Sequence, residues 1–166
     1  MSAERTDLES RMIRRRLNGL NVPPARNPDT DDPYPVTYKY GIEGDEWAAG
    51  HHTGEDYRCP TGSLAVSVSW GTVLYIGTTV PGGWSSKGAY GLHIIVRSPE
   101  HDIGWCHLSA AKIMRNQFVR PGTILGLTGE SGNASGPHLH FEARPIGGLY
   151  GSDVHPGYAR NRTFAP

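Results

Sequence analysis

The most informative stretch of this chain is Gly136-Pro137-His138-Leu139-His140-Phe141-Glu142. Polar and apolar residues alternate from His138 to Arg144, which is the period of a half-buried β-strand. Histidines spaced i, i+2 then share one strand face, with their Cβ atoms about 7 Å apart. Imidazole is the commonest metal ligand and the side chain best suited to proton transfer near neutral pH. The stretch therefore predicts either a metal-hydrolytic centre or two polar residues on a solvated sheet face.

The rest of the chain consists of short apolar runs between turn residues. Only 37% of the 166 residues are hydrophobic, and 22 Gly and 13 Pro interrupt the sequence, which favours strands and turns over long helices. Strands are expected at 64–68, 71–77, 92–96, 103–108, 123–127 and 138–144, and a short helix at 109–118. The expected fold is mainly β: an antiparallel sheet core with a groove walled by loops at about 42–50, 78–89 and 129–137.

The first 34 residues have a different character from the remainder. Apolar residues recur near helical spacing over 6–20, after a Thr6–Glu9 segment that resembles a capping box, so a short N-terminal helix is expected. Residues 23–35 are rich in Pro, Asp and Asn, which is typical of a linker or an arm lying on the surface. We therefore expect a helix and linker arm at 1–34 and one compact domain at 35–166.

Charge and hydropathy argue against several classes of partner. The formal net charge is zero, so long-range attraction to nucleic acid is not expected. No apolar run approaches the roughly 20 residues of a membrane span. The charged N-terminus shows no secretory signal, which predicts a protein that starts in a cytoplasm or has had its signal removed. A monomer is expected.

A second polar cluster is His51-His52-Thr53-Gly54-Glu55-Asp56. On a straight strand His52 and Asp56 lie too far apart to bind one ion, but a backbone bend at Gly54 would bring them together. Two imidazoles and one carboxylate are a common zinc set that leaves a fourth tetrahedral position for water. Together with the histidine pair, this cluster favours a metal site. Strand parity points His51 away from it, so His51 is expected to be a bystander.

The third polar signal is Trp105-Cys106-His107-Leu108, at the end of an expected strand. In regular alternation Trp105 and His107 face one way, while Cys106 and Leu108 face the other. His107 is thus expected on the face of the histidine pair, and Cys106 on the opposite face. Counted from Asp56, the same alternation places Cys59 on the other face of its strand. The two cysteines are expected to be buried thiols, or a disulfide if their strands pair.

These motifs together resemble a known family. The elements His52-Thr53-Gly54-Glu55-Asp56, His107-Leu108 and His138-Leu139-His140-Phe141-Glu142 occur in the order and rough spacing found in the lysostaphin-type, or LytM-like, zinc metallopeptidases. The similarity runs from about Val36 to Arg144. It implies a mostly antiparallel β-sheet with zinc held in a loop-walled groove, and it makes residues 35–166 a zinc peptidase domain.

The resemblance also implies a role for each matching residue. His52, Asp56 and His140 correspond to the zinc ligands, and His107 and His138 to the catalytic pair. One of that pair would transfer the proton, and the other would hydrogen-bond the developing oxyanion; the sequence does not say which does which. Glu142 either orients a ligand or forms a cross-strand ion pair. Tyr90, near a groove loop, is a candidate substrate contact.

The implied activity is zinc-dependent hydrolysis of amide bonds in the stem peptides or cross-bridges of bacterial peptidoglycan, leading to cell-wall lysis. A chain without a visible signal or wall-binding repeat suits a phage lysin, which accumulates in the host cytoplasm and then reaches the wall; otherwise the enzyme is expected to be secreted. The alternative is a non-catalytic wall-binding or regulatory member of the same fold. The sequence leaves the cleaved bond open.

Overall fold

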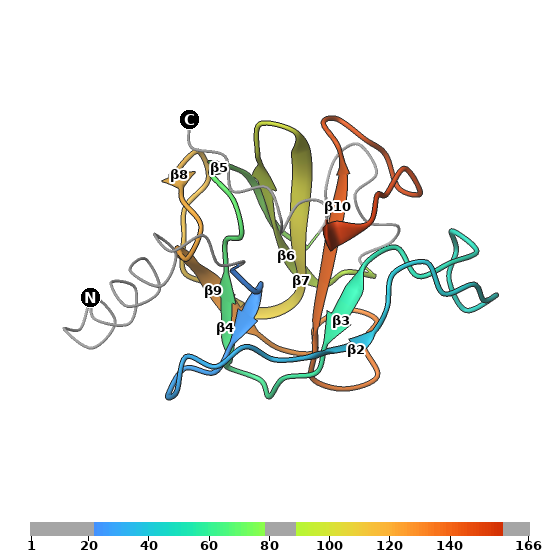
Figure 1. Ribbon diagram of the computed structural model, residues 1–166, viewed down its shortest axis with the longest axis horizontal. Coiled ribbons are helices and arrows are strands. Elements are labelled where there is room, and N and C mark those ends of the chain that lie inside the picture. The colour runs from blue at the N-terminus through green and yellow to red at the C-terminus, as the bar shows by residue number, and fades with distance from the viewer. Residues whose placement is uncertain (1–21, 79–88, 158–166) are drawn as a thin grey trace.

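Ten short strands form one antiparallel sheet in the computed structural model, which describes residues 22–78 and 89–157 (Figure 1). The strands are β1 Ala25–Arg26, β2 Val36–Tyr38, β3 Glu55–Tyr57, β4 Leu64–Val66, β5 Gly71–Gly77, β6 Leu92–Arg97, β7 His101–Ala111, β8 Phe118–Val119, β9 Ile124–Thr128 and β10 Leu139–Pro145. The expected mainly β, antiparallel fold is confirmed. The helix expected at 6–20 lies outside the described residues.

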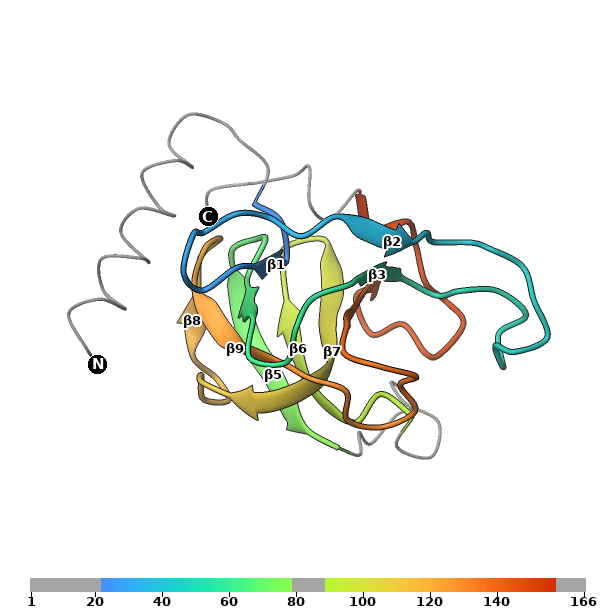
Figure 2. The same cartoon turned by 90° about the horizontal axis from the view of Figure 1, so that it is seen from below.

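Strand β7 is the centre of the sheet. Its first part pairs with β6 on one side and β10 on the other, and its end pairs with β9. Beyond β10 the sheet continues through β3 to β2, and beyond β9 through β4 to β1. Seen from below, the sheet curls so that β4 and β9 come round toward β6 and β7 (Figure 2). The indole Nε1 of Trp105 in β7 donates to the Val66 carbonyl in β4 at 3.0 Å, across the inside of this curl.

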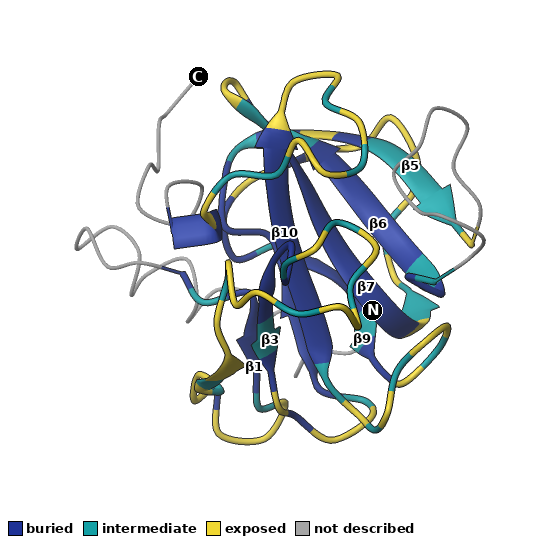
Figure 3. Ribbon diagram, turned by 90° about the vertical axis from the view of Figure 1, so that its right-hand side faces the viewer, coloured by how far each residue is buried: buried dark blue, intermediate teal, exposed yellow. Residues whose placement is uncertain are grey.

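The main hydrophobic core fills the inside of the curled sheet. Trp105 and Phe141, both fully buried, lie side by side with ring centroids 5.3 Å apart. Leu139 and Ala143 share the face of Phe141 and belong to the same core, as the period of two in β10 predicts. The ribbons of β6, β7 and β10 are almost entirely buried (Figure 3). One face of β10 therefore belongs to the core, and its other face is left for His140 and Glu142.

The prediction of a helix at 109–118 is wrong. Strand β7 continues through this region to Ala111, which pairs with Gly126 of β9. The turn that follows includes Asn116 with a φ of 67°, a left-handed conformation that a helix does not contain. Phe118 and Val119 then form β8 against β5. Pairing with neighbouring strands overrides the weak helical preference of this short segment.

Residues 22–34 are packed onto the sheet. Strand β1 pairs with β4, and Val22 and Ala25 are buried. The turn after β1 is held by Arg26, whose guanidinium lies 3.1 Å from the Asp31 carboxylate. Across residues 22–78 and 89–157 the structure has no helix with the length and apolar character needed to cross a bilayer.

Candidate metal centre and catalytic site

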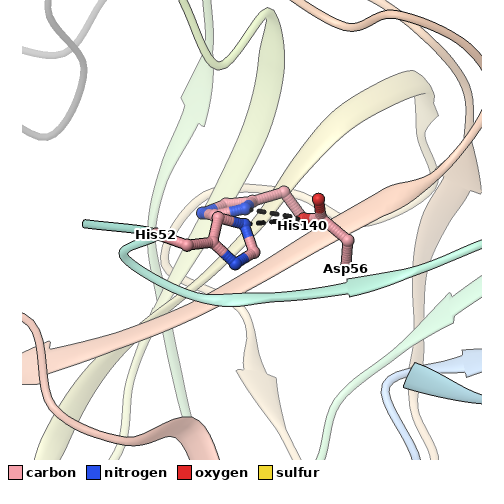
Figure 4. Close-up of side chains that lie close together, drawn as sticks. All are labelled: His52, Asp56 and His140. Carbon is pink, nitrogen blue, oxygen red and sulfur yellow. Dashed lines mark hydrogen bonds and ion pairs between the residues drawn. The ribbon is translucent and has the colours of Figure 1, made fainter. Parts of the chain in front are cut away.

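Strands β3 and β10 bring three polar side chains together. Asp56 in β3 lies directly opposite His140 in β10, because the register of the two strands pairs these residues. His52 precedes β3 and reaches the same place because the chain bends at Gly54. The side-chain atoms of His52, Asp56 and His140 that could bind a metal lie within 4.8 Å of one another (Figure 4). The three residues predicted as ligands therefore form one cluster.

Hydrogen bonds leave one nitrogen of each clustered imidazole directed at Asp56. The Nδ1 of His52 donates to the Lys39 carbonyl at 2.9 Å, and its Nε2 lies 3.2 Å from Asp56 Oδ1. His140 has the opposite arrangement: Nε2 lies 3.1 Å from Glu142 Oε2, and Nδ1 lies 2.9 Å from Asp56 Oδ1. Metal-binding histidines are held in this way, with the second nitrogen donating to a carbonyl or carboxylate.

The electrostatics of the cluster favour a positive charge at its centre. Burial opposes a charge on His140, but the hydrogen bonds with Asp56 and Glu142 outweigh it and raise the pKa of His140 to about 9. Burial of Asp56 opposes its charge as well, yet the hydrogen bonds with His140 and His52 hold the pKa of that carboxyl well below its usual range. A bound cation would take the place of the proton that these carboxylates stabilise.

The predicted catalytic pair, His107 and His138, stands beside the cluster. Their ring centroids are 4.7 Å apart. The Nε2 of His138 lies 3.8 Å from Asp56 Oδ2, and the ring of His107 lies 6.0 Å from that of His140. All five predicted metal and catalytic residues therefore meet in one place, on the face of β10 that does not pack in the core.

Backbone carbonyls fix the orientation of both rings. The Nδ1 of His107 donates to the Ser131 carbonyl at 2.8 Å, and the Nδ1 of His138 donates to the Gly136 carbonyl at 2.9 Å. Because a carbonyl only accepts, Nδ1 carries a proton in each ring, and Nε2 is the nitrogen that no carbonyl engages. Burial, together with the charge on His140, lowers the pKa of His107 to about 3, so its ring is neutral at neutral pH.

A β-bulge places His107 on the site face of β7. Leu92 pairs with Leu108 and Ile94 pairs with Trp105, so β7 has one residue more than β6 over this interval. His107 sits in the bulge with a φ of 62°, which is unusual for a residue with a side chain. Trp105 and Leu108 both remain in the core. The bulge therefore allows His107 to turn toward the site without moving the core residues on either side.

The same bulge makes the expected position of Cys106 wrong. Cys106 pairs with His140 across β7 and β10, so it lies on the face of His140 rather than opposite it. Its side chain is fully buried there against Tyr90 and Ile95. Regular alternation does not hold through a bulge, which is why the parity argument failed at this residue. Cys106 and Cys59 are both buried free thiols.

Comparison with known proteins agrees with this geometry. The sequence profile of peptidase family M23 matches residues 50–156. The chain belongs to peptidase family M23. The DD-carboxypeptidase/endopeptidase Mpg of Neisseria meningitidis is 33% identical over 106 residues, which make up 63% of this chain and 22% of that protein. Lysostaphin of Staphylococcus simulans is 31% identical over 111 residues, covering 66% of this chain and 20% of lysostaphin.

The structural similarity extends to the solved M23 fold. The catalytic domain of lysostaphin superposes with a TM-score of 0.67 at 23% identity, covering 78% of this chain and 93% of that domain. The chain spans about a fifth of the length of the curated relatives it matches, at 22% and 20%. The M23 match from residue 50 to residue 156 includes all five predicted metal and catalytic residues.

Tyr90, the predicted substrate contact of this M23 domain, is directed into the protein. Its ring stacks on that of His140, with centroids 5.3 Å apart and planes inclined by 29°. Its hydroxyl donates to the Glu142 carboxylate in a short hydrogen bond and lies 3.2 Å from Thr53 Oγ1. Only 7% of Tyr90 is exposed. A substrate contact by Tyr90 stays a prediction, while its observed contacts support the candidate ligand His140.

Other residues at the site gave no clear signal in the sequence. Trp47, in an expected groove loop, has its ring 5.4 Å from that of His52, and the partly exposed Tyr38 lies 5.6 Å from Trp47. Ser131 holds the bulge in place: its hydroxyl accepts from the Leu92 amide at 3.0 Å and donates to the Leu108 carbonyl at 2.7 Å. A serine in a Gly-rich loop has no pattern that reveals these contacts.

The neighbouring histidines take up other positions. His51, the expected bystander, has Nε2 2.8 Å from Asp153 Oδ2 and Nδ1 3.1 Å from the Ala49 carbonyl, so both its nitrogens are engaged away from the cluster. His93 is fully buried, and its Nδ1 donates to the Gly91 carbonyl at 2.8 Å. Neither residue belongs to the cluster of His52, Asp56 and His140.

Substitution of Gly54 by Ala should disrupt the metal centre. A Cβ on Gly54 would lie 2.4 Å from the Phe141 carbonyl oxygen and 2.8 Å from Cε1 of His140, so β3 and β10 would have to separate. We expect the free energy of unfolding to fall by about 1–3 kcal/mol, the usual cost of overpacking. We also expect weaker metal binding, because His140 must move. Chemical denaturation and metal titration measure the two effects.

Gly136→Ala is the matched control for this substitution, because a Cβ at Gly136 meets nothing within 4 Å. It should keep the stability and metal affinity of the wild type. If Gly54→Ala bound metal as tightly as Gly136→Ala, the close approach at His140 would not matter for the site.

Proposed function

We propose that this chain is a zinc-dependent endopeptidase that hydrolyses amide bonds in the peptides of bacterial peptidoglycan. The observation that carries the proposal is the convergence of His52, Asp56 and His140 beside the oriented rings of His107 and His138. Membership of peptidase family M23 supports peptide hydrolysis. The relative from N. meningitidis is named a DD-carboxypeptidase/endopeptidase, which supports the same class of reaction.

The residues present fit a zinc ion. Nε2 of His52, Nδ1 of His140 and a carboxylate oxygen of Asp56 are the donors, and each imidazole has its other nitrogen engaged by a carbonyl or carboxylate. Two nitrogens and one oxygen are a common catalytic zinc set that leaves a position open for substrate or water. Zinc supplies Lewis acidity in such sites, activating water and polarising a carbonyl.

The proton-handling atoms in this proposal are Nε2 of His107 and Nε2 of His138. Each ring carries its proton on Nδ1, which leaves Nε2 to accept a proton from the attacking water or to donate one to the leaving amine. The other ring donates a hydrogen bond to the oxyanion once its own Nε2 carries a proton. The two ring centroids are 4.7 Å apart, close enough for both rings to face one peptide group in this proposal.

The alternative, a non-catalytic wall-binding or regulatory member, requires a defective site. The described structure contains all three candidate ligands and both proton-handling histidines, already oriented by hydrogen bonds. This completeness favours the enzyme over the binding module.

Mass spectrometry of fragments released from purified peptidoglycan tests the proposal. We expect the protein to release peptides with new amino termini, a chelator to stop the release, and added zinc to restore it. The masses identify the cleaved bond and so separate stem-peptide from cross-bridge cleavage. Fragments that appear at the same rate after complete metal removal would rule out the zinc mechanism. Binding to the wall without any release of fragments would favour the alternative.

The finer form of the proposal is that the chain lyses intact cell walls, as a phage lysin does. The turbidity of a suspension of susceptible cells should then fall on addition of protein from outside, and not when a chelator is present. If purified peptidoglycan were cleaved while cells with exposed walls stayed intact, a lytic role would be wrong.

A further inference from the structure

Glu142 is a carboxylate in an unusual place, fully buried on the face of β10 that carries His140. Its two oxygens have different partners. Oε1 accepts from Nε of Arg144 at 2.5 Å, and Arg144 is also fully buried. Oε2 faces the metal centre and lies 3.1 Å from Nε2 of His140. One oxygen therefore balances the charge, while the other is directed at a candidate ligand.

Two further donors hold Oε2 of Glu142 in this position. The hydroxyl of Thr53 donates to it at 2.7 Å, and the hydroxyl of Tyr90 donates to it in a short hydrogen bond. Thr53 adjoins the candidate ligand His52, and the ring of Tyr90 is stacked on His140. The carboxylate oxygen and the imidazole are thus held relative to each other by contacts on both.

Stability alone is a weak account of this arrangement. Burying two charges costs free energy that their attraction often fails to recover, and an apolar pair of similar volume is frequently as stable. The Glu142–Arg144 pair is buried beside the candidate metal centre, with Oε2 of Glu142 3.1 Å from Nε2 of His140. A carboxylate without its proton only accepts, so Nε2 of His140 must donate to Glu142. Nδ1 is then the nitrogen that faces Asp56, at 2.9 Å, and the one that would give up its proton to a bound metal ion.

We propose that Glu142, held by Thr53, Tyr90 and Arg144, is a positioning residue that sets the tautomer of His140 and thereby the zinc affinity of the site. Glu142 acts through His140 and does not touch the substrate. Removing the hydrogen-bond partner of a metal-binding histidine typically costs about 10- to 100-fold in metal affinity. The inference rests on the proposed function only in that His140 is a zinc ligand.

Two double variants test it with zinc alone as the probe. Glu142→Gln with Arg144→Leu removes the buried ion pair but keeps an amide oxygen that accepts from Nε2 of His140. Glu142→Leu with Arg144→Leu removes the ion pair and the acceptor together. We expect the first variant to bind zinc within a few-fold of the wild type, and the second about 10- to 100-fold more weakly. Competition with a chromogenic chelator measures the dissociation constants, and thermal unfolding of the metal-free proteins compares their stability.

Equal zinc affinities for the two double variants would overturn the inference, because only the first keeps an oxygen at position 142 that accepts from His140, Thr53 and Tyr90. A second measurement needs no variant. Imidazole 15N spectra of the zinc-bound wild type should show His140 protonated at Nε2 and metal-bound at Nδ1; the reverse assignment would overturn the inference even if the variants failed to fold. A wild type that binds no zinc would overturn the proposed function as well. Equal zinc affinities of the two double variants, with zinc bound by the wild type, would overturn this inference alone.

Discussion

Replacement of His140 by Ala should abolish both metal binding and hydrolysis. The imidazole of His140 supplies the candidate donor Nδ1, and Asp56, 2.9 Å away, also loses one of its two histidine hydrogen bonds. A site reduced to His52 and Asp56 has too few donors for tight zinc binding. We expect the purified variant to contain almost no zinc by elemental analysis, and its rate of peptidoglycan cleavage to fall by about 1,000-fold or more.

His101→Ala serves as the control for this variant. His101 begins β7 and pairs with Pro145, at the end of β10 away from the metal centre. The His101→Ala variant should keep its zinc content and activity at wild-type levels. Zinc retained in full by the His140 variant would show that the ion is held elsewhere.

Replacement of His107 by Ala should separate catalysis from metal binding. His107 lies outside the ligand cluster, with its Nδ1 bound to the Ser131 carbonyl and its ring 4.7 Å from that of His138. The variant should keep its zinc while cleavage slows by about 100- to 10,000-fold, the usual contribution of a general acid or base. Zinc content and the rate of amino-group release, measured on the same sample, test both statements.

The His138 variant completes this comparison. If His107 and His138 share the proton transfer and the stabilisation of the oxyanion, removing either one should impair turnover, and removing both should cost less than the product of the single effects. A His107→Ala variant with wild-type turnover would exclude this residue from the reaction.

The strands that could be predicted from sequence are those with enough residues to show alternation. Strand β5 was expected at 71–77 and runs Gly71–Gly77, because an apolar run between glycines marks both of its ends. Strands β1, β3 and β8 have two or three residues, too few to show a period, and form because neighbouring strands offer hydrogen bonds. The prediction of a helix at 109–118 was wrong for the same reason, because Ala111 pairs with β9 whatever its own helical preference.

The candidate site could be predicted as far as its residue types and their order. Motifs that match a known family indicated five residues, and the structure brings all five together. Their surroundings could not be predicted in the same way. The bulge at His107 appears only in the pairing of β7 with β6, and it reverses the expected side of Cys106. The partners of Glu142 come from distant parts of the chain, since Tyr90 and Thr53 lie far from it in the sequence.

A zinc titration of the metal-free protein, with peptidoglycan cleavage as the readout, tests the zinc-dependent mechanism directly. The proposed site contains one cluster of His52, Asp56 and His140, with both proton-handling histidines beside it. We predict that metal-free protein releases no new amino termini, and that the rate rises in proportion to added zinc and levels off when zinc equals protein. Metal-free protein that cleaves as fast as the zinc-loaded protein would show that hydrolysis does not depend on zinc.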